Sequence, residues 1–368
     1  MRFKKKLILI FLSLGWILLQ SNNVNSINNR IEKFRGESHD LSVQLLFTLG
    51  TTDRESESFY NPGDVAIGEN GNIYVLDSGN SRIQCFSSKG EFLFSFGRYG
   101  QGPGELSKNA ATLEVLSDGN LYLIDNQQYR ISVFSPKGDF IKSYKIRSWY
   151  DDIFLFKDKY YLTSFEISEN HRPIHIASNL NKIEKSFGSV VDPGFNLFEM
   201  VKLSPIPQEK IFSNQKMSSL IVNSKGHIYY SQRNPYKIIK YLQNGVKMKE
   251  FSRKVKFETR YQLSMEYKEG VLKKTLPGPS ATIPEIYFWK NEFILVPIFS
   301  PDRAEKFLDI YDPDGNLAYS YKFPIELYEK EKGIYIAATE LDRNNNFYCL
   351  YYTQKDPPLL SIYAITIK

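Results

Sequence analysis

Residues 71–92 read GNIYVLDSGNSRIQCFSSKGEF, and residues 119–140 read GNLYLIDNQQYRISVFSPKGDF. The two stretches match at glycine, aspartate, arginine and aromatic positions with one constant offset of 48 residues, from Gly71 to Gly119. A constant offset across such different residue types indicates an internal repeat. A period of this length is typical of solenoids, propellers and other arrays built from one supersecondary unit.

The repeated unit predicts β-strands joined by tight turns. In the first copy, apolar runs at 72–77 and 82–86 flank Ser-Gly-Asn at 78–80, and a Lys-Gly turn leads into 91–96. Glycine and asparagine between apolar runs are the chemistry of β-hairpins. A further apolar run at 63–68 precedes the first hairpin, so each unit supplies four antiparallel strands, here named a to d.

Four more copies follow with greater drift. They contain residues 160–162, 226–229, 291–294 and 346–348, and the copy at 226–229 lies 155 residues from the first. Six units of four antiparallel strands predict an all-β fold, a six-bladed β-propeller in a single domain.

The two ends of the chain predict how the ring closes. The sixth unit stops after its third strand, whereas residues 45–50 resemble the fourth strand at 91–97. We therefore expect the amino-terminal strand to complete the last blade, which would leave no open seam between the chain ends.

Residues 61–66, 71–83 and 96–97 resemble NHL repeats, and the chain as a whole resembles the six-bladed NHL-type propellers that bacteria export. This resemblance implies the fold. It implies little about activity, because propellers host many unrelated functions.

The amino terminus predicts export. Arg2, Lys4, Lys5 and Lys6 precede an apolar run at 7–19, the pattern of a signal peptide. We expect a signal peptide at 1–26, a linker at 27–41 and the propeller at 42–368, in a secreted or periplasmic protein. An uncleaved membrane anchor is the alternative; no cysteine follows the apolar run, which excludes a lipoprotein anchor.

Removal of the signal peptide changes the charge argument. The whole chain carries a formal charge of +6, but residues 1–26 hold four basic and no acidic residues, which leaves 43 basic and 41 acidic residues. A net charge of +2 is not typical of a nucleic-acid-binding protein. We expect no nucleic-acid partner and no membrane span after cleavage, and we expect a monomer.

Long connections gather on one predicted face. In a propeller the a–b and c–d turns lie on one face and the b–c and d–a connections on the other. The short Gly-containing turns all belong to the first class. The long connections belong to the second class: 98–107, 164–173, 189–217, 252–280, 297–306 and 353–358. For the basic insertion 252–280 a helix over the channel, a strip for an acidic partner and a solvated rim loop are possible, and we favour the loop.

Binding sites usually lie on long loops of a rigid scaffold. We therefore predict ligand binding on the face of the b–c and d–a connections. The candidate binding residues on this face are Arg98, Tyr99, Tyr129, His171, His175, Arg233 and Arg303.

Histidines give little support for a metal centre. The chain has four: His39, His171, His175 and His227. Two ligands on one loop do not make a metal site without further ligands. One enzyme class that the resemblance includes, a metal-dependent lyase, has a metal site with histidines from several blades. This chain has too few suitably placed histidines for such a site. We expect no metal, no cofactor and no catalytic residues.

Two sets of repeated or paired residues favour structural roles. Asp77 with Arg82, and Asp125 with Arg130, recur at the same spacing beside the b–c turn, where aspartate can accept turn N–H groups while arginine pairs with a neighbouring blade. Cys85 and Cys349 fall in adjoining blades, so they could form a disulfide bond. We favour two buried free thiols instead.

These observations predict an exported, non-enzymatic propeller that binds a protein, peptide or glycan. The alternatives are a metal-dependent lyase or hydrolase with its site at the channel mouth, and an RNA-binding NHL domain, against which both export and charge argue.

Overall fold

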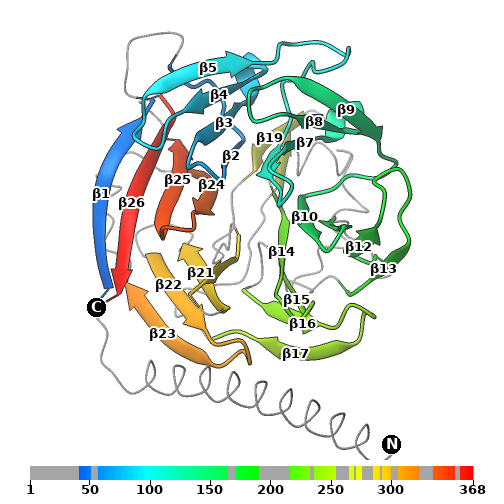
Figure 1. The fold of residues 1–368 in the computed structure, drawn as a ribbon, viewed down its shortest axis with the longest axis vertical. Helices are drawn as coiled ribbons and strands as arrows, with labels where there is room; N and C mark the ends of the chain where they lie inside the picture. The colour runs from blue at the N-terminus through cyan, green and yellow to red at the C-terminus, as the bar shows by residue number, and fades with distance from the viewer. Residues whose placement is uncertain are drawn as a thin grey trace, which may run out of the picture.

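A computed structural model describes residues 41–50, 57–164, 171–189, 216–232, 236–253, 265–268, 271–275, 285–290, 292–299, 306–322, 335–352 and 357–367. Within them, six four-stranded antiparallel sheets stand around a central axis, as the ring in Figure 1 shows. The prediction of a six-bladed β-propeller is confirmed.

Each blade runs from an inner strand a to an outer strand d. The strands of blades one to three are, in turn, β2 (Asp64–Ile67), β3 (Ile73–Asp77), β4 (Arg82–Phe86) and β5 (Phe92–Phe96); β6 (Thr112–Val115), β7 (Leu121–Asp125), β8 (Arg130–Phe134) and β9 (Phe140–Lys145); β10 (Asp152–Phe156), β11 (Lys159–Thr163), β12 (Ile174–Ala177) and β13 (Lys185–Phe187). The strands of blades four to six are β14 (Ser218–Val222), β15 (Ile228–Gln232), β16 (Ile238–Tyr241) and β17 (Lys247–Phe251); β20 (Tyr287–Trp289), β21 (Phe293–Phe299), β22 (Lys306–Tyr311) and β23 (Leu317–Lys322); β24 (Tyr335–Leu341), β25 (Asn346–Tyr352), β26 (Leu359–Ile367) and β1 (Leu41–Leu49).

The sixth blade joins the two ends of the chain. Strand β1 pairs antiparallel with β26, from Leu41 opposite Ile367 to Leu49 opposite Leu360. The predicted closure is therefore confirmed. Because the seam of the ring is a hydrogen-bonded strand pair, its opening would break a whole ladder rather than a loop contact.

The apolar core is divided among the six contacts between neighbouring blades. For example, Tyr74 and Ile83 of blade one pack with Leu113 and Leu121 of blade two. The other five clusters lie in the same way between blades two and three, three and four, four and five, five and six, and six and one. Large aromatic residues suit this arrangement because each fills the space between two twisted sheets.

The tyrosine of the repeated motif explains part of this contact. Tyr74 donates from its hydroxyl to the carbonyl oxygen of Pro136 at 2.8 Å, and Tyr229 donates to that of Pro313 at 2.9 Å. Both acceptors lie in the c–d turn of the next blade. The motif therefore encodes a contact between blades as well as a strand.

The two cysteines are free and buried, as favoured from the sequence. Burial raises the pKa of the Cys85 thiol to about 11 and that of the Cys349 thiol to about 12. Both are therefore protonated and inert near neutral pH.

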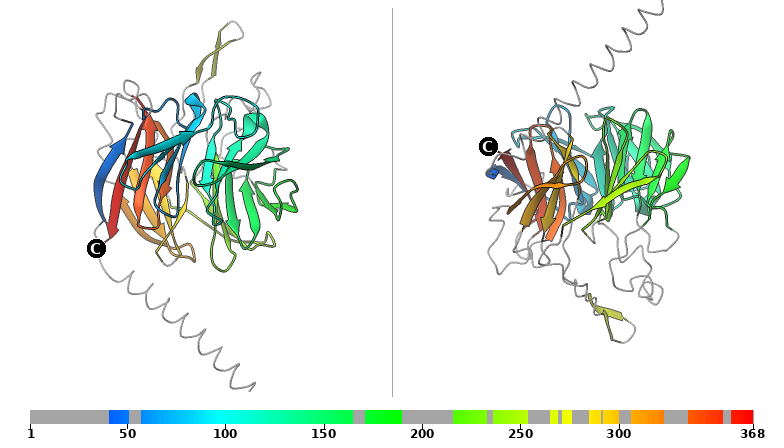
Figure 2. Two further views of the ribbon diagram at one scale, coloured as in Figure 1. Left: turned by 45° about the horizontal axis from the view of Figure 1, so that its top comes forward. Right: turned by 90° about the horizontal axis from the view of Figure 1, so that it is seen from below.

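The insertion at 252–280 differs from the helix and from the plain loop considered above. It contains an antiparallel hairpin, β18 (Met265–Lys268) and β19 (Val271–Thr275), which projects from one face of the ring in Figure 2. The apolar–polar alternation in Met-Glu-Tyr-Lys suits a strand better than a helix.

The chain outside the described residues includes 1–40, so the expected signal peptide and linker lie outside them. No helix in the described part of the chain is long and apolar enough to cross a membrane.

Candidate functional site

The central channel contains ionisable side chains that the sequence analysis did not single out. Each blade contributes one, in its inner strand or just before it. We call this set the channel ring: Asp64, Glu114, Asp152, Lys216, Glu285 and Glu340.

Lys216 is the cation of this ring. Its ammonium nitrogen lies 2.6 Å from a carboxylate oxygen of Glu114, 2.5 Å from one of Glu285 and 3.3 Å from one of Asp152. The lysine side chain is only 7% exposed. The ammonium therefore joins blades two, three, four and five through charges that are shielded from water.

The ring holds five carboxyl groups and one ammonium group, so its carboxyl groups cannot all be ionised at low cost. Burial raises the pKa of Asp64 to about 7. Burial likewise raises the pKa of Glu285, and raises those of Glu114 and Glu340 well above their usual range, each with neighbouring carboxylates adding to the effect. Part of the ring is therefore protonated near neutral pH.

Carboxylate oxygens of Asp64, Glu114 and Glu285 lie within 4.8 Å of one another, a spacing at which three such groups could hold a metal ion. However, Lys216 already lies against Glu114 and Glu285. An ammonium group at the centre opposes a second cation there, so the ring does not fit a resident metal, and we assign none.

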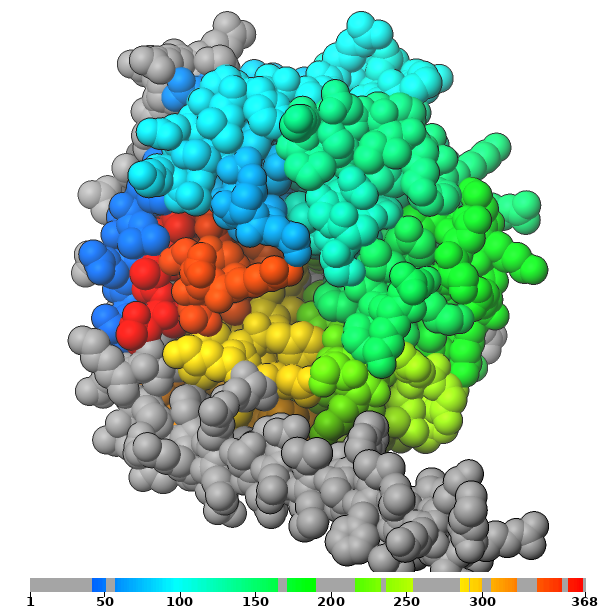
Figure 3. Space-filling view, viewed as in Figure 1, coloured from blue at the N-terminus to red at the C-terminus, as the bar shows by residue number. Residues whose placement is uncertain are grey.

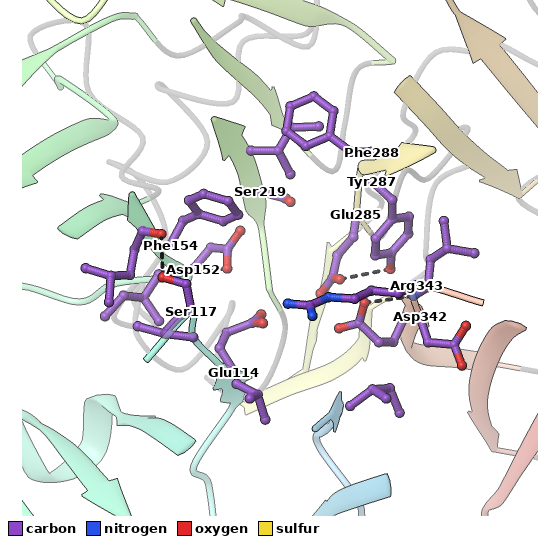
Figure 4. A pocket seen from close by; sticks show the side chains of 18 of the residues that line it. Glu114, Ser117, Asp152, Phe154, Ser219, Glu285, Tyr287, Phe288, Asp342 and Arg343 are labelled. Atoms are coloured by element: carbon purple, nitrogen blue, oxygen red, sulfur yellow. Dashed lines mark hydrogen bonds between the residues drawn. The ribbon is translucent and has the colours of Figure 1, made fainter. Parts of the chain in front are cut away.

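A cavity of about 360 Å³ leads from this ring to the face of the a–b turns. Glu69, Ser117 and Arg343 border its opening. Figure 3 shows this face of the molecule with its central hollow, and Figure 4 shows Glu114, Asp152 and Glu285 pointing into the cavity. The described cavity thus opens on the face opposite the one predicted for binding.

The predicted face contains the structural aspartate–arginine pairs. In blade one, Asp77 is buried and accepts hydrogen bonds from the Tyr60 backbone at 2.7 Å and from Arg82 Nε at 2.9 Å. Arg82 also donates to the carbonyl oxygen of Ser58. The pair holds the d–a connection onto the b–c turn of its own blade. The expectation that Arg82 pairs with a neighbouring blade stays a prediction.

In blade two, the aspartate and arginine at the same positions have different hydrogen-bond partners. Asp125 accepts from the Ser107 backbone at 2.8 Å and from the Ser107 hydroxyl at 2.7 Å. Arg130 donates to carbonyl oxygens of Gln101, Gly102 and Glu105 instead of pairing with Asp125. Together they fasten the long connection at 98–107, which makes this loop a fixed part of the surface.

Replacement of Asp125 by alanine will lower the free energy of unfolding by about 1–3 kcal/mol, because the buried Ser107 N–H and hydroxyl lose their acceptor. Urea denaturation measures this loss. The control is Asp139→Ala, at an exposed c–d turn where the carboxylate accepts from the Ser135 hydroxyl, and it should change stability little. Equal losses in the two variants would contradict the structural role.

Three candidate binding residues are exposed on the predicted face. Arg98 and Tyr99 lie in the fixed d–a connection, where Arg98 pairs with Glu105 at 2.8 Å. Tyr129 follows the b–c turn η2 (Asn126–Gln128), as Ser81 follows η1 (Ser78–Asn80) in blade one. Tyr129 has a positive φ of 50°. A bulky residue in this conformation costs ~1 kcal/mol or more, which marks a position worth a functional explanation.

The two candidate histidines are brought together by a serine. The Ser164 hydroxyl lies 3.0 Å from His171 Nε2 and 2.7 Å from His175 Nε2. His175 Nδ1 lies 2.8 Å from the Ser186 hydroxyl. Burial, with a smaller effect of His171, lowers the pKa of His175 to about 4, so this ring is neutral near pH 7.

A serine next to a histidine invites comparison with a nucleophile and its base. Here the serine is buried, and the pKa of His175 is too low for an efficient general base near neutral pH. The Ser164 backbone also donates to the Pro173 carbonyl oxygen at 3.0 Å. This network therefore fits a role in shaping the b–c connection of blade three. Arg233 and Arg303 lie outside the described residues.

The channel ring was missed because its members share no motif. Most are the one ionisable residue in or beside an otherwise largely apolar inner strand, as in residues 111–115, which read ATLEV; Asp152 instead follows a second acid, Asp151. A search for single charges in these runs could have found the ring once the blades were assigned.

Residues 59–86 match the family model of the NHL repeat. No curated protein matches the chain. Among solved structures, the chain is similar to a member of the DUF4221 family from Bacteroides vulgatus, with 11% identity and a TM-score of 0.56 over 89% of this chain and 99% of that one.

It is also similar to a protein of Bacteroides fragilis described as exported, with 14% identity and a TM-score of 0.53 over 89% of this chain and 95% of that one. Virginiamycin B lyase from Staphylococcus aureus matches with 11% identity and a TM-score of 0.49, over 89% of this chain and 100% of that one. At these identities the similarity shows the fold alone, because one propeller fold serves many activities.

Proposed function

We propose that this six-bladed propeller, which carries an NHL repeat, is an exported protein that binds a protein, peptide or glycan partner without catalysing a reaction. The binding surface in this proposal is the face of the b–c and d–a connections, hereafter the loop face. The basic and apolar start of the sequence supports export, and one of the propellers that the chain resembles is itself described as exported.

One observation carries the proposal. Among the described residues, the exposed large aromatic side chains are Tyr60, Tyr99 and Tyr129, at 67%, 68% and 43% exposure, and all three belong to connections on the loop face. The other exposed large apolar side chains are aliphatic or methionine and follow the outer strands and their turns. Tyrosine suits recognition because it offers a large, rigid and amphipathic contact surface at low entropic cost.

Two features oppose the catalytic alternative. In the channel, Lys216 already neutralises carboxylates that a metal would need. On the loop face, the buried Ser164 lies beside a weakly basic His175. A stoichiometric metal ion in the purified mature protein, measured by elemental analysis, would support the metal-dependent lyase or hydrolase instead.

A binding screen tests the proposal. The mature protein is applied to arrays of glycans and of peptides, and the strongest binder is then titrated against variants. We expect Tyr99→Ala and Tyr129→Ala each to weaken binding at least ~10-fold, since a buried aromatic anchor contributes on the order of 2 kcal/mol to an interface.

The control for these variants is Ile141→Ala, an exposed apolar residue on the outer strand β9. It removes similar surface away from the loop face and should leave binding unchanged. If the tyrosine variants bind as the unchanged protein does, the loop face is not the binding surface.

A further inference from the structure

The described connections on the loop face of blades one to three carry exposed basic side chains. In the described b–c and d–a connections of this face, the exposed charged side chains are all basic: Arg98, Lys108, Arg147 and Arg172. The acidic side chains of the same connections are partly withdrawn from solvent: Glu57, Glu105 and Asp151.

Two of these acids are also engaged within the protein. Glu105 accepts from Arg98 Nε at 2.8 Å and from the Gly102 backbone at 2.7 Å. Asp151 accepts from the Ser218 hydroxyl at 2.6 Å, and burial raises its pKa to about 7. Among the described side chains of these connections, the bases are therefore the more exposed charges.

The basic residues belong to connections that are bonded to one another. Gln128 Nε2 donates to the Gly100 carbonyl oxygen at 2.7 Å, which joins the connection of Arg98 to that of Tyr129. The Ile146 backbone donates to the Tyr129 carbonyl oxygen at 2.9 Å, which adds the connection of Arg147.

The surface then continues into blade three. The ring of Tyr150 lies edge-on to the ring of His175, with centroids 5.4 Å apart. This contact joins the connection of Arg147 to the His171–His175 segment, which contains Arg172.

The exposed tyrosines lie within this basic surface. Lys108 Nζ lies 5.5 Å from the centre of the Tyr99 ring, so a positive charge and an open aromatic ring are adjacent. Tyr129 occupies a left-handed backbone position, whereas the matching position in blade one holds a buried serine, Ser81. The left-handed strain is common to both positions, but in blade two it presents an aromatic ring to solvent.

We propose that the partner on the loop face is a polysaccharide bearing carboxylate or sulfate groups. This inference rests on the function proposed above and names the partner's chemistry. Tyr99 and Tyr129 stack against sugar rings, while Arg147 and Arg172 pair with the anionic groups, since a guanidinium matches their planar or trigonal oxygens.

The described part of this face suits a glycan with charges along its length. Open tyrosine rings beside exposed bases match a partner that presents flat sugar rings and repeated anionic groups.

The experiment uses the mature full chain in affinity electrophoresis, with each polymer embedded in the gel. The polymers are polygalacturonate for carboxylates, heparin for sulfates, dextran as a neutral glycan, poly-glutamate as an acidic peptide and poly(U) as a single-stranded RNA. We expect retardation by polygalacturonate or heparin, weakened at least tenfold in Tyr99→Ala/Tyr129→Ala and in Arg147→Gln/Arg172→Gln.

The matched control is Lys89→Gln/Lys137→Gln, which removes the same charge from two exposed c–d turns on the opposite face. It should bind as the unchanged protein does. Equal losses in this control and in the arginine variant would show general ion exchange and would overturn the inference.

The remaining outcomes separate the two proposals. Retardation by dextran that depends on the tyrosines but not on the arginines would overturn the inference and keep the proposed function. Equal or stronger retardation by poly-glutamate or poly(U) would also overturn it. If no polymer is retained and the arrays show no binder, both proposals fail.

Discussion

Replacement of Lys216 by methionine will lower the free energy of unfolding by about 3–5 kcal/mol near neutral pH, because it leaves buried carboxylates without their cation. The ammonium pairs with Glu114, Glu285 and Asp152 at distances from 2.5 to 3.3 Å. Methionine has nearly the volume of the lysine stem, so the loss reports the charge and not a cavity. Urea denaturation of the two proteins measures it.

A matched control comes from the surface. Lys159 pairs with Glu184 at 2.8 Å, but both side chains are exposed. Surface pairs of this kind contribute little because water and salt screen them. Lys159→Met should therefore change the free energy of unfolding only slightly. A similarly small change in Lys216→Met would show that the Lys216 ammonium does not stabilise the buried carboxylates of the ring.

A second variant tests whether unpaired carboxylate charge causes the loss of stability in Lys216→Met. In Lys216→Met/Glu114→Gln one of the stranded carboxylates is neutral, so part of the lost stability should return. If the double variant is no more stable than Lys216→Met alone, lost packing and not unpaired charge explains the effect.

The free energy of unfolding of the unchanged protein will fall as the pH rises from 5 to 8. Burial raises the pKa of Asp64 to about 7 and raises those of Glu114, Glu285 and Glu340, whereas the same groups titrate near pH 4 in an unfolded chain. The native protein therefore retains protons that the unfolded chain has released. The stability that these protonated groups contribute is complete below about pH 4 and is lost as the pH rises through the folded pKa values.

The expected slope is about 1.4 kcal/mol per pH unit for each extra proton that the native state retains. Urea midpoints at pH 5, 6, 7 and 8 give this slope. Surface carboxylates with lowered pKa, such as Glu184 at about 2, weaken the fold only at more acidic pH. Burial lowers the pKa of His175 to about 4, which opposes the slope below about pH 6.5, so the ring is read from the slope above that pH. Asp151, whose pKa burial raises to about 7, adds to the same slope.

Glu340→Gln provides the control for the source of the slope. An amide oxygen can still accept the bond that Leu341 donates to Glu340 at 2.7 Å, but it cannot titrate. The variant should show a shallower slope above pH 6. A flat profile for the unchanged protein, or an unaltered slope in the variant, would contradict a protonated ring.

The channel ring and the loop face differ in the role that their geometry suits. In the channel ring, the ammonium group of Lys216 offsets part of the carboxylate charge. Its contacts link the inner strands of several blades, which suits a structural role. The loop face instead presents uncovered tyrosines on loops held by Asp77, Arg82, Asp125 and Arg130. Rigid loops with open aromatic side chains are the better basis for recognition, because little entropy is lost when a partner binds.

Local sequence signals specify the fold to the level of the individual blade. A constant offset between Gly71 and Gly119, turn glycines between apolar runs, and the outer-strand pattern at 45–50 specify local strands and hairpins, and a ring follows once six units are counted. These signals are local, so they are readable without coordinates. The same local logic placed Tyr99, Tyr129 and the two candidate histidines on one face.

Which charged residues meet depends on how the blades are arranged around the axis. Members of the ring such as Asp64 and Glu340 lie far apart in the sequence and become neighbours because inner strands converge on the axis. The same applies to Ser164, whose hydroxyl meets both His171 and His175. Strand patterning sets the face on which a side chain lies, whereas the closure of the ring sets its partners across the channel, and no local signal encodes that distance.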